Sequence, residues 1–455
     1  MTALNISAFT PHDLRESVLS EVHARPFTPL TQPVSVIRFA FMAKNGIKDR
    51  IKNGTAGDSA SADRASVAAF CAEHGVAPPE PGIKHHQVVI GPARLRWEQH
   101  SEFATFTWIW SPPAGAAPRH FGEIAPELQA LIAALKLSGE LLVAVKLEVA
   151  STADPLARAE ALFDKSSLAL VEVKGSNGAV ASDFRVDEDG FTRILVCADG
   201  PTPERLGALV QRVLELETYR TLALLGLPAA LALAPQVDRI ERRLVEVLEE
   251  MQGAETLKLN NHLLRELTAL AALLERGATG SLFRFGASRA YWDLVQARLN
   301  VIEGEPIAPY SSWSSFLARR IAPAMRTLNA LEGRQSELSR KLARAADLLR
   351  TRVDVELEEQ NRDLLRSMNE RTKLQLRLQS TVEGLSVAAI GYYVVSLFGY
   401  LAKGAHDIGL PVEPTFVTAA FVPVAIALIW FTTHQIRKRH LKEDQDHGAA
   451  KAGKE

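Results

Sequence analysis

Glu21, His23 and Arg25 place three chemically active side chains close together near the start of the chain, within the segment EVHARPF (residues 21–27). A carboxylate, an imidazole and a guanidinium group so close together could form an anion site or a polar interface with another subunit. The structural alternative is a helix end, where His23 and Arg25 cap the last turn and Pro26 stops it. No nucleophile, partner acid or metal-ligand spacing accompanies them, so this segment does not predict catalysis.

Metal and cofactor chemistry has little support in the rest of the sequence. His85, His86, His100 and His120 are scattered among predicted strands, and adjacent strand residues such as His85 and His86 point to opposite faces. The chain has no Walker loop, Gly-x-Gly-x-x-Gly, Gly-x-Ser-x-Gly or His-Glu-x-x-His sequence. These residues therefore predict a non-enzymatic protein with no catalytic residues, and they leave any cofactor or metal unknown.

The amino-acid composition limits which binding partners can be expected. The formal net charge of −1 gives no reason to expect that the protein binds a nucleic acid. The two cysteines, Cys71 and Cys197, lie too far apart in sequence for a zinc knuckle and form no disulfide framework, so we expect reduced, buried thiols. The first residues lack a basic start followed by an apolar core, so no secretory signal is predicted.

A third chemical pattern lies within an apolar run near the end of the chain. Ser386, Tyr393 and Tyr400 recur every seven residues, and Ser396 and Lys403 lie beside them on one side of a helix. The functional interpretation is a stripe of hydroxyl groups that faces a pore or another subunit. The alternative is ordinary packing of membrane helices, with tyrosines near the headgroups.

Two uncharged runs, residues 384–402 and 415–433, must position that stripe. Each is about the length that a helix needs to cross a hydrocarbon core of roughly 30 Å. Basic residues precede the first run and follow the second, whereas the loop between them has Lys403 alone among Lys and Arg. The pattern predicts a transmembrane hairpin with both termini in the cytoplasm.

Residues 1–200 predict a cytoplasmic α+β domain, namely a mostly antiparallel sheet with flanking helices. Helices are expected at 11–23, 65–74, 126–137 and 155–163. The expected strands are residues 34–42, 85–90, 93–99, 103–110, 140–149, 167–173, 179–186 and 191–198.

Residues 202–383 predict an all-helical stalk without strands, and residues 434–455 a basic and then disordered cytoplasmic tail. Glycines and prolines divide the first part into expected helices at 203–225, 237–276 and 281–303. After Pro323 one long helix is expected to continue into the first apolar run. Its heptad pattern needs a partner, either the helix at 237–276 or another copy of the chain; the leading members are Leu328, Leu331, Leu338, Leu342, Ala345 and Leu349.

Four segments resemble one bacterial family. They are residues 21–27, FRFGASRAYWDLVQARL (283–299), RTRVDVELEEQN (350–361) and LQLRLQSTVEGLSVAAIGYYVVSLFGYLAKG (374–404). They are similar to the membrane-anchored proteins grouped as domain of unknown function 3422. The resemblance implies a membrane anchor in a bacterial cytoplasmic (inner) membrane and no particular activity.

The predicted layout is also similar to that of the CorA-type magnesium channels, which are homo-oligomers whose first span lines the pore. Their Gly-Met-Asn signature is missing, and the corresponding place reads GYLAKG (399–404). Lys403 at an outer mouth would repel cations unless it points away from the axis. We therefore expect a homo-oligomeric, channel- or transporter-like assembly in the lipid bilayer, with a cytoplasmic regulatory domain. The alternative is a membrane-anchored scaffold or sensor that conducts nothing.

Overall fold

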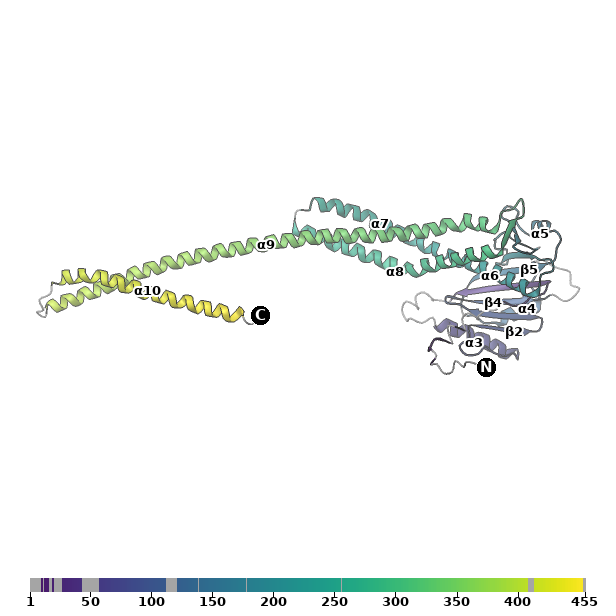
Figure 1. Ribbon diagram of the computed structural model, residues 1–455, viewed down its shortest axis with the longest axis horizontal. Helices are drawn as coiled ribbons and strands as arrows, with labels where there is room; N and C mark the ends of the chain where they lie inside the picture. Colours follow the sequence, from purple (N-terminus) through teal and green to yellow (C-terminus); the bar gives the residue numbers. More distant parts are fainter. Residues whose placement is uncertain are drawn as a thin grey trace, which may run out of the picture. The chain divides into compact units, whose positions relative to one another are not determined.

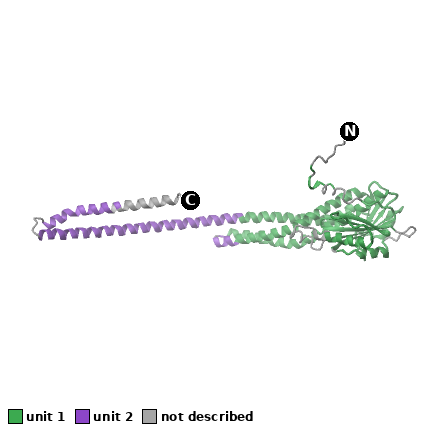
Figure 2. Ribbon diagram, turned by 90° about the horizontal axis from the view of Figure 1, so that it is seen from below, with its two compact units in different colours: residues 1–253, 263–346 green, residues 254–262, 347–455 purple. Residues whose placement is uncertain are grey.

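The structure is a computed structural model of the chain. It describes residues 27–42, 57–111, 121–407 and 413–452, with the exception of 138, 177 and 255. Six positions before residue 20 are also described. The side chains of residues 57–60, 433–434 and 436–452 are outside the description. Contacts divide the chain into two compact units (Figure 2). Unit 1 comprises residues 1–253 and 263–346, and unit 2 comprises residues 254–262 and 347–455. The sheet and most of the helices after residue 202 therefore share one unit.

A nine-stranded, mostly antiparallel sheet forms the centre of unit 1 (Figure 1). Its strand order is β2-β3-β4-β1-β5-β8-β7-β6-β9, and among the described strand pairs β5 and β8 alone run parallel. This confirms the predicted type of sheet. The strands are β1 (Val34–Met42), β2 (His85–Ile90), β3 (Ala93–Gln99), β4 (Phe103–Trp110), β5 (Glu140–Ala150), β6 (Ala169–Val173), β7 (Ala179–Ser182), β8 (Thr192–Cys197) and β9 (Glu303–Pro306).

Alternation along the strands gives the sheet two different faces. On β5, Val145, Leu147 and Val149 belong to one core, while Lys146 and Glu148 lie between them on the opposite face. The first core contains side chains of α6 (Pro203–Leu224), α8 (Leu257–Ile302) and the start of α9 (Trp313–Asp407). The second face meets α3 (Gly57–Glu73), α4 (Pro126–Ala134) and α5 (Pro155–Leu162) in two further clusters.

Helix starts in unit 1 follow local sequence rules. Thr202 caps α6 by accepting a hydrogen bond from the Arg205 N–H, and Pro203 occupies the first turn. Asp154 caps α5 in the same way with the Ala157 N–H, again before a proline. The cysteines Cys71 and Cys197 are buried and unpaired, as expected, and burial raises the pKa of each thiol.

Several predicted boundaries after residue 202 are wrong. Helix α7 (Gly226–Gln252) passes through Pro235, and α8 passes through Gly277 and Gly280, where breaks were expected. A Cβ on Gly277 would lie 2.9 Å from Leu233 Cδ1, so this glycine allows α7 and α8 to approach closely and does not end a helix. The expected helix 237–276 is instead interrupted between α7 and α8.

Two more segments differ from the sequence expectation. Strand β9, with the sequence EGEP, pairs with β6 in a region expected to be wholly helical. Glycine, proline and acidic residues are depleted in strands, so residues 303–306 adopt a strand because they pair with β6 and not because of their own propensity. Helix α10 (Pro414–Ala452) extends through the basic part of the tail and into residues 443–452, where composition favoured disorder.

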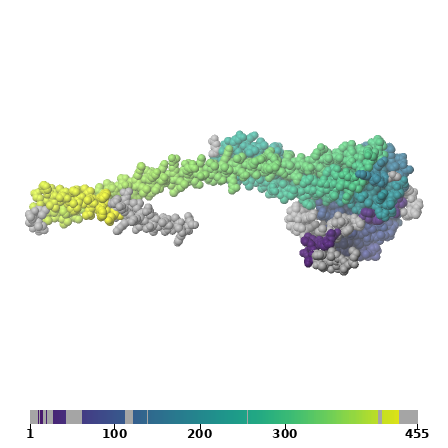
Figure 3. Space-filling model, in the orientation of Figure 1, coloured from purple at the N-terminus to yellow at the C-terminus, as the bar shows by residue number. Residues whose placement is uncertain are grey.

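Unit 2 contains the later part of α9 and all of α10. Phe398 of α9 stacks on Phe421 of α10 with ring centroids 3.8 Å apart. Gly391 and Gly399 approach Ile429 and Thr418, since a Cβ on either glycine would be within 4 Å of those side chains. Figure 3 shows the atoms of the two helices in contact. Small residues at the crossing are typical of helix pairs that pack closely in membranes.

Candidate functional site

The predicted hydroxyl stripe lies on α9 within unit 2. Tyr393 and Tyr400 are 72% and 76% exposed, Ser386 and Lys403 are exposed, and Ser396 is half-buried. Helix α10 contacts α9 through Gly391 and Phe398, which lie on the other side of the helix, and through Gly399, which borders Ser396. Within the described residues, α10 therefore leaves Ser386, Tyr393, Tyr400 and Lys403 exposed and only Ser396 half-buried.

The stripe is the end of a much longer pattern that sequence reasoning missed. Alternating steps of four and three residues continue it upstream along α9, and we call the whole set the uncharged α9 face. Between residues 361 and 400 every Asp, Glu, Lys and Arg lies off this face, although charges are dense in residues 358–383. Its members are Asn361, Leu365, Met368, Thr372, Gln375, Gln379, Val382, Ser386, Ala389, Tyr393, Ser396 and Tyr400, and Lys403 lies one step beyond its end.

The uncharged α9 face contains large apolar side chains that are exposed within the chain. Leu365 is 67% exposed, Met368 62% and Val382 57%. Amide and hydroxyl groups alternate with them, so the face is neither a plain leucine seam nor a solvated charged surface. A seven-residue repeat drifts by about 20° per heptad on a straight helix, so copies that followed this face would wind around one another in a left-handed supercoil.

Among the described residues, three helical segments are long and apolar enough to cross a membrane, by length and composition. They lie in Pro203–Gln252, in Trp313–Asp407 and at Pro414–Thr432. The first was not among the two expected spans. Its most apolar window is 28% buried, against 6% and 11% for the others, and α6 packs on β5 in the core of unit 1.

The other predicted site residues do not converge in the described part of the chain. Glu21, His23 and Arg25 lie outside the described residues, as does His120. A ring nitrogen of His86 lies 2.9 Å from the Ala77 carbonyl oxygen, and His100 stacks on Phe103. A search of the described residues finds no group of three or more His, Cys, Asp or Glu that could hold a metal ion.

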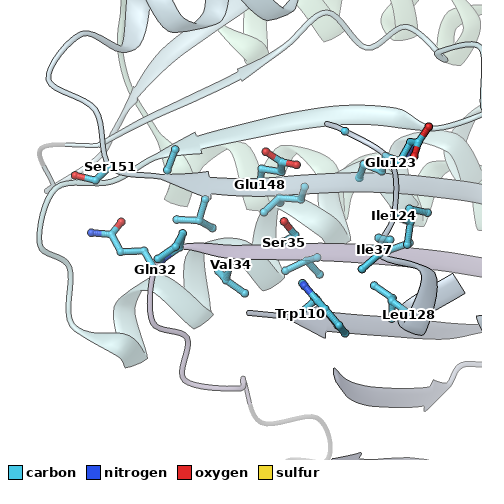
Figure 4. A pocket seen from close by; sticks show the side chains of 18 of the residues that line it. Gln32, Val34, Ser35, Ile37, Trp110, Glu123, Ile124, Leu128, Glu148 and Ser151 are labelled. Atoms are coloured by element: carbon cyan, nitrogen blue, oxygen red, sulfur yellow. The ribbon is translucent and has the colours of Figure 1, made fainter. Parts of the chain in front are cut away.

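A pocket of about 850 Å³ opens on the second face of the sheet in unit 1 (Figure 4). Its floor comes from three neighbouring strands, because Ser35 of β1 pairs with Trp110 of β4 on one side and with Glu148 of β5 on the other. Ile124, Leu128 of α4 and Arg158 of α5 form the walls. This volume is within the usual range for small-molecule sites.

Glu148 is the most perturbed carboxyl group of this pocket. Burial raises its pKa to about 7, although a hydrogen bond from the backbone N–H of Phe121 (2.7 Å to Oε1) and the charge of Lys146 act in the opposite direction. Phe121 adopts a left-handed backbone conformation (φ 54°), which is uncommon for a residue with a side chain. Its ring packs edge-on against Phe163, which holds the donor in place.

Lys146, two residues before Glu148 on the same face, already has other partners. Its Nζ donates to Asp189 Oδ2 at 3.0 Å and lies 4.6 Å from the centre of the Phe191 ring. The pocket thus combines a carboxyl group of near-neutral pKa, an indole, an aliphatic wall and an engaged lysine. Sequence alone offered one signal, the charged pair Lys146 and Glu148 within an otherwise apolar strand.

A second buried carboxylate, Glu98, lies on the opposite face of the sheet. Burial raises its pKa, but the guanidinium groups of Arg38 and Arg96 outweigh that effect and hold the pKa below its ordinary value. Arg96 donates to Glu98 Oε1 at 2.7 Å, and Arg38 lies 3.6 Å from Oε2. This cluster is closed by its own partners, so it supports the fold and offers no site for a ligand.

The fold and these sites define an α+β sheet domain joined to a helical region that contains candidate membrane spans. The chain belongs to the family described as protein of unknown function (DUF3422), whose model matches residues 10–440. The expected resemblance to this family is therefore confirmed, whereas the similarity in layout to CorA-type channels stays a prediction. A comparison with curated proteins found no match.

Proposed function

We propose that this protein is a two-span membrane protein that assembles with further copies of itself along the uncharged α9 face, as a channel- or transporter-like complex. The two spans are the end of α9 and the start of α10. The candidate within Pro203–Gln252 is assigned to the soluble unit because its α6 part packs on the sheet. Basic residues at the outer flanks support a topology with both termini in the cytoplasm of a bacterial cell.

The observation that carries this proposal is the uncharged α9 face itself. Leaving a leucine or methionine in water forgoes about 1.5–3 kcal/mol per side chain, and this face exposes several of them. Around a symmetry axis each layer would meet its own copies, so an uncharged layer brings no like charges together. A continuous set of such layers from the stalk into the span therefore fits self-association better than it fits lipid alone.

The proposal of a channel-like function adds that a conduction path runs along the axis of the assembly. Hydroxyl groups of Ser386, Tyr393 and Ser396 would line the axis, and Lys403 would place a ring of positive charge at its outer end. That ring disfavours cations and would favour anions. The second candidate function is a membrane-anchored scaffold or sensor that conducts nothing and presents the pocket of unit 1.

The mass of the full-length protein in nanodiscs tests the assembly. We expect an oligomer for the natural chain and its dissociation by Met368→Glu, which places a charge on the uncharged α9 face. Leu374→Glu is the matched control, because Leu374 is equally exposed (61%) but lies on another side of α9. A monomeric natural chain would refute the proposal, as would equal effects of the two variants.

Ion flux into proteoliposomes separates the two functions. The channel-like function predicts flux that changes with Tyr393→Leu and Ser396→Leu. An intact oligomer without flux for any ion tested would select the scaffold or sensor function.

A further inference from the structure

We propose that the cytoplasmic end of the membrane hairpin binds anionic phospholipids through a cationic cluster that its two helices share. The cationic cluster consists of Arg371, Lys373 and Arg377 on α9 and of the four Lys and Arg residues within 437–442 on α10. This inference rests on the two-span topology proposed above, but it does not require that copies of the chain assemble.

Contacts within unit 2 bring the two parts of the cationic cluster to one level. Phe398 stacks on Phe421, and nearer the stalk Gly391 approaches Ile429, so α9 and α10 run antiparallel. Both helices continue beyond these contacts with the same rise of about 1.5 Å per residue. Residues 377–382 of α9 therefore lie level with the part of α10 that carries the basic residues.

Arg377 lies on the side of α9 that α10 contacts. It precedes Gly391 and Phe398 by multiples of seven residues, which return to nearly the same side of a helix. Lys373 lies one turn before Arg377 on that side, away from the uncharged α9 face. Both side chains are exposed, and their charged groups form no hydrogen bond or ion pair with another described residue. They are therefore available to an anion outside the chain.

Positive charge is in excess at this level of the hairpin. Residues 371–382 and 434–442 contain seven Lys and Arg and no Asp or Glu. The bordering acidic residues, which the positive charges outnumber, are Glu370, Glu383 and Glu443. At the other end of the hairpin, residues 403–413 contain one lysine and two acidic residues. The protein therefore presents an excess of positive charge to one membrane surface and not to the other.

The phosphate group of a phospholipid is the anion that fits this position. The cationic cluster begins a few residues outside the two uncharged runs, at the depth of the lipid headgroups. Phosphate oxygens accept charge-assisted hydrogen bonds from guanidinium and ammonium groups, and they would offset the repulsion between like charges on adjacent helices. The cluster therefore favours a lipid of net negative charge, such as phosphatidylglycerol, over zwitterionic phosphatidylcholine.

Quenching of tryptophan fluorescence by brominated lipids tests this preference in the full-length protein. Trp430 is 64% exposed near the end of the second span, and the other five tryptophans lie in unit 1. The protein would be reconstituted in phosphatidylcholine vesicles that contain either acyl-brominated phosphatidylglycerol or the same fraction of acyl-brominated phosphatidylcholine. We expect brominated phosphatidylglycerol to quench at least about twofold more, and this excess to decrease in about 0.5 M NaCl.

The double substitution Lys373→Gln with Arg377→Gln should reduce the excess quenching at least about twofold. Arg362→Gln with Arg366→Gln is the matched control, because these residues share the spacing, the side of α9 and the exposure. They lie about 16 Å farther from the bilayer, which exceeds the Debye length of about 8 Å at physiological ionic strength, so the control should keep the excess.

Equal quenching by the two brominated lipids would overturn this inference and leave the two-span topology intact. Equal effects of the two double substitutions, or no effect of either, would also overturn it. Absence of quenching by both brominated lipids would instead contradict the membrane span itself, and with it the proposed function.

Discussion

The two units handle polar groups in opposite ways. In unit 1 charges are buried but paired, as with Glu98 between Arg38 and Arg96, or Arg284 with Glu102 at 2.6 Å. In unit 2 the uncharged α9 face has no charge from residue 361 to 400, yet its apolar side chains are exposed. The first arrangement is complete within one chain. The second leaves an apolar surface exposed within the chain, and for this reason we propose that assembly involves unit 2.

The largest expected effect comes from opening the closed cluster of unit 1. Glu98→Gln leaves two buried guanidinium groups without their carboxylate, which should cost about 3–5 kcal/mol of unfolding free energy. Tryptophan fluorescence reports the transition, since Trp97 and Trp108 are buried in the same unit. Asp238→Asn, which removes an exposed partner of Arg334, should cost at most about 1 kcal/mol. Equal costs for the two variants would contradict the account of this cluster.

A smaller effect concerns the pH dependence of unfolding. The carboxyl groups of Glu148 and Glu98 in unit 1 should change the free energy of unfolding in opposite directions as pH rises. Glu148 has a folded pKa of about 7 against 4.5 in the unfolded chain, so the folded state holds its proton longer. Its contribution therefore decreases as pH rises from about 4.5 to 7, by about 2–3 kcal/mol at 1.4 kcal/mol per pKa unit.

Urea unfolding of the natural chain and of Glu148→Gln over this pH range measures that contribution, and the variant should lose it. Glu98 has a lowered pKa, so its stabilisation is present above the unfolded pKa and is lost only as pH falls further through the folded pKa. A natural chain and a Glu148→Gln variant with the same pH dependence would refute the assignment for Glu148.

The smallest expected effect lies at the contact between α9 and α10. Gly399→Leu would press against Thr418 and should destabilise the pair by about 1–3 kcal/mol through overpacking. Gly384→Leu is the matched control, because a Cβ there meets nothing within 4 Å. Thermal loss of helical circular dichroism in detergent compares the two. If Gly384→Leu destabilises as much as Gly399→Leu, the contact described in unit 2 is wrong.

Local sequence patterns were sufficient to predict many strands of the sheet. They could not predict features that depend on contacts between residues far apart in the sequence. The bounds of β1 to β4 agree with the alternation of residues and the turns between them. Strand β9 could not be predicted, since its partner β6 lies far away in sequence. Gly277 was misinterpreted for a similar reason, because its role depends on Leu233 of another helix.

The candidate sites show the same division. The pocket combines residues 35, 110 and 148, which only the strand order brings together. The uncharged α9 face was present in the sequence, but the heptad pattern predicted from Leu328 to Leu349 depends on apolar residues and does not reveal where charges are missing. The stripe at Ser386, Tyr393 and Tyr400 was found from spacing alone, and whether it faces another copy stays a prediction.

Cysteine cross-linking between copies tests the central claim most directly. Single cysteines would be placed from residue 361 to 400 in a full-length chain whose Cys71 and Cys197 are replaced by alanine, in membranes. The account predicts maximal dimer yield at positions 365, 368, 372, 375, 379 and 382, with a seven-residue period that continues to 393 and 400. Maximal yield at 363, 370 and 377, or no dimer at any position, would contradict it.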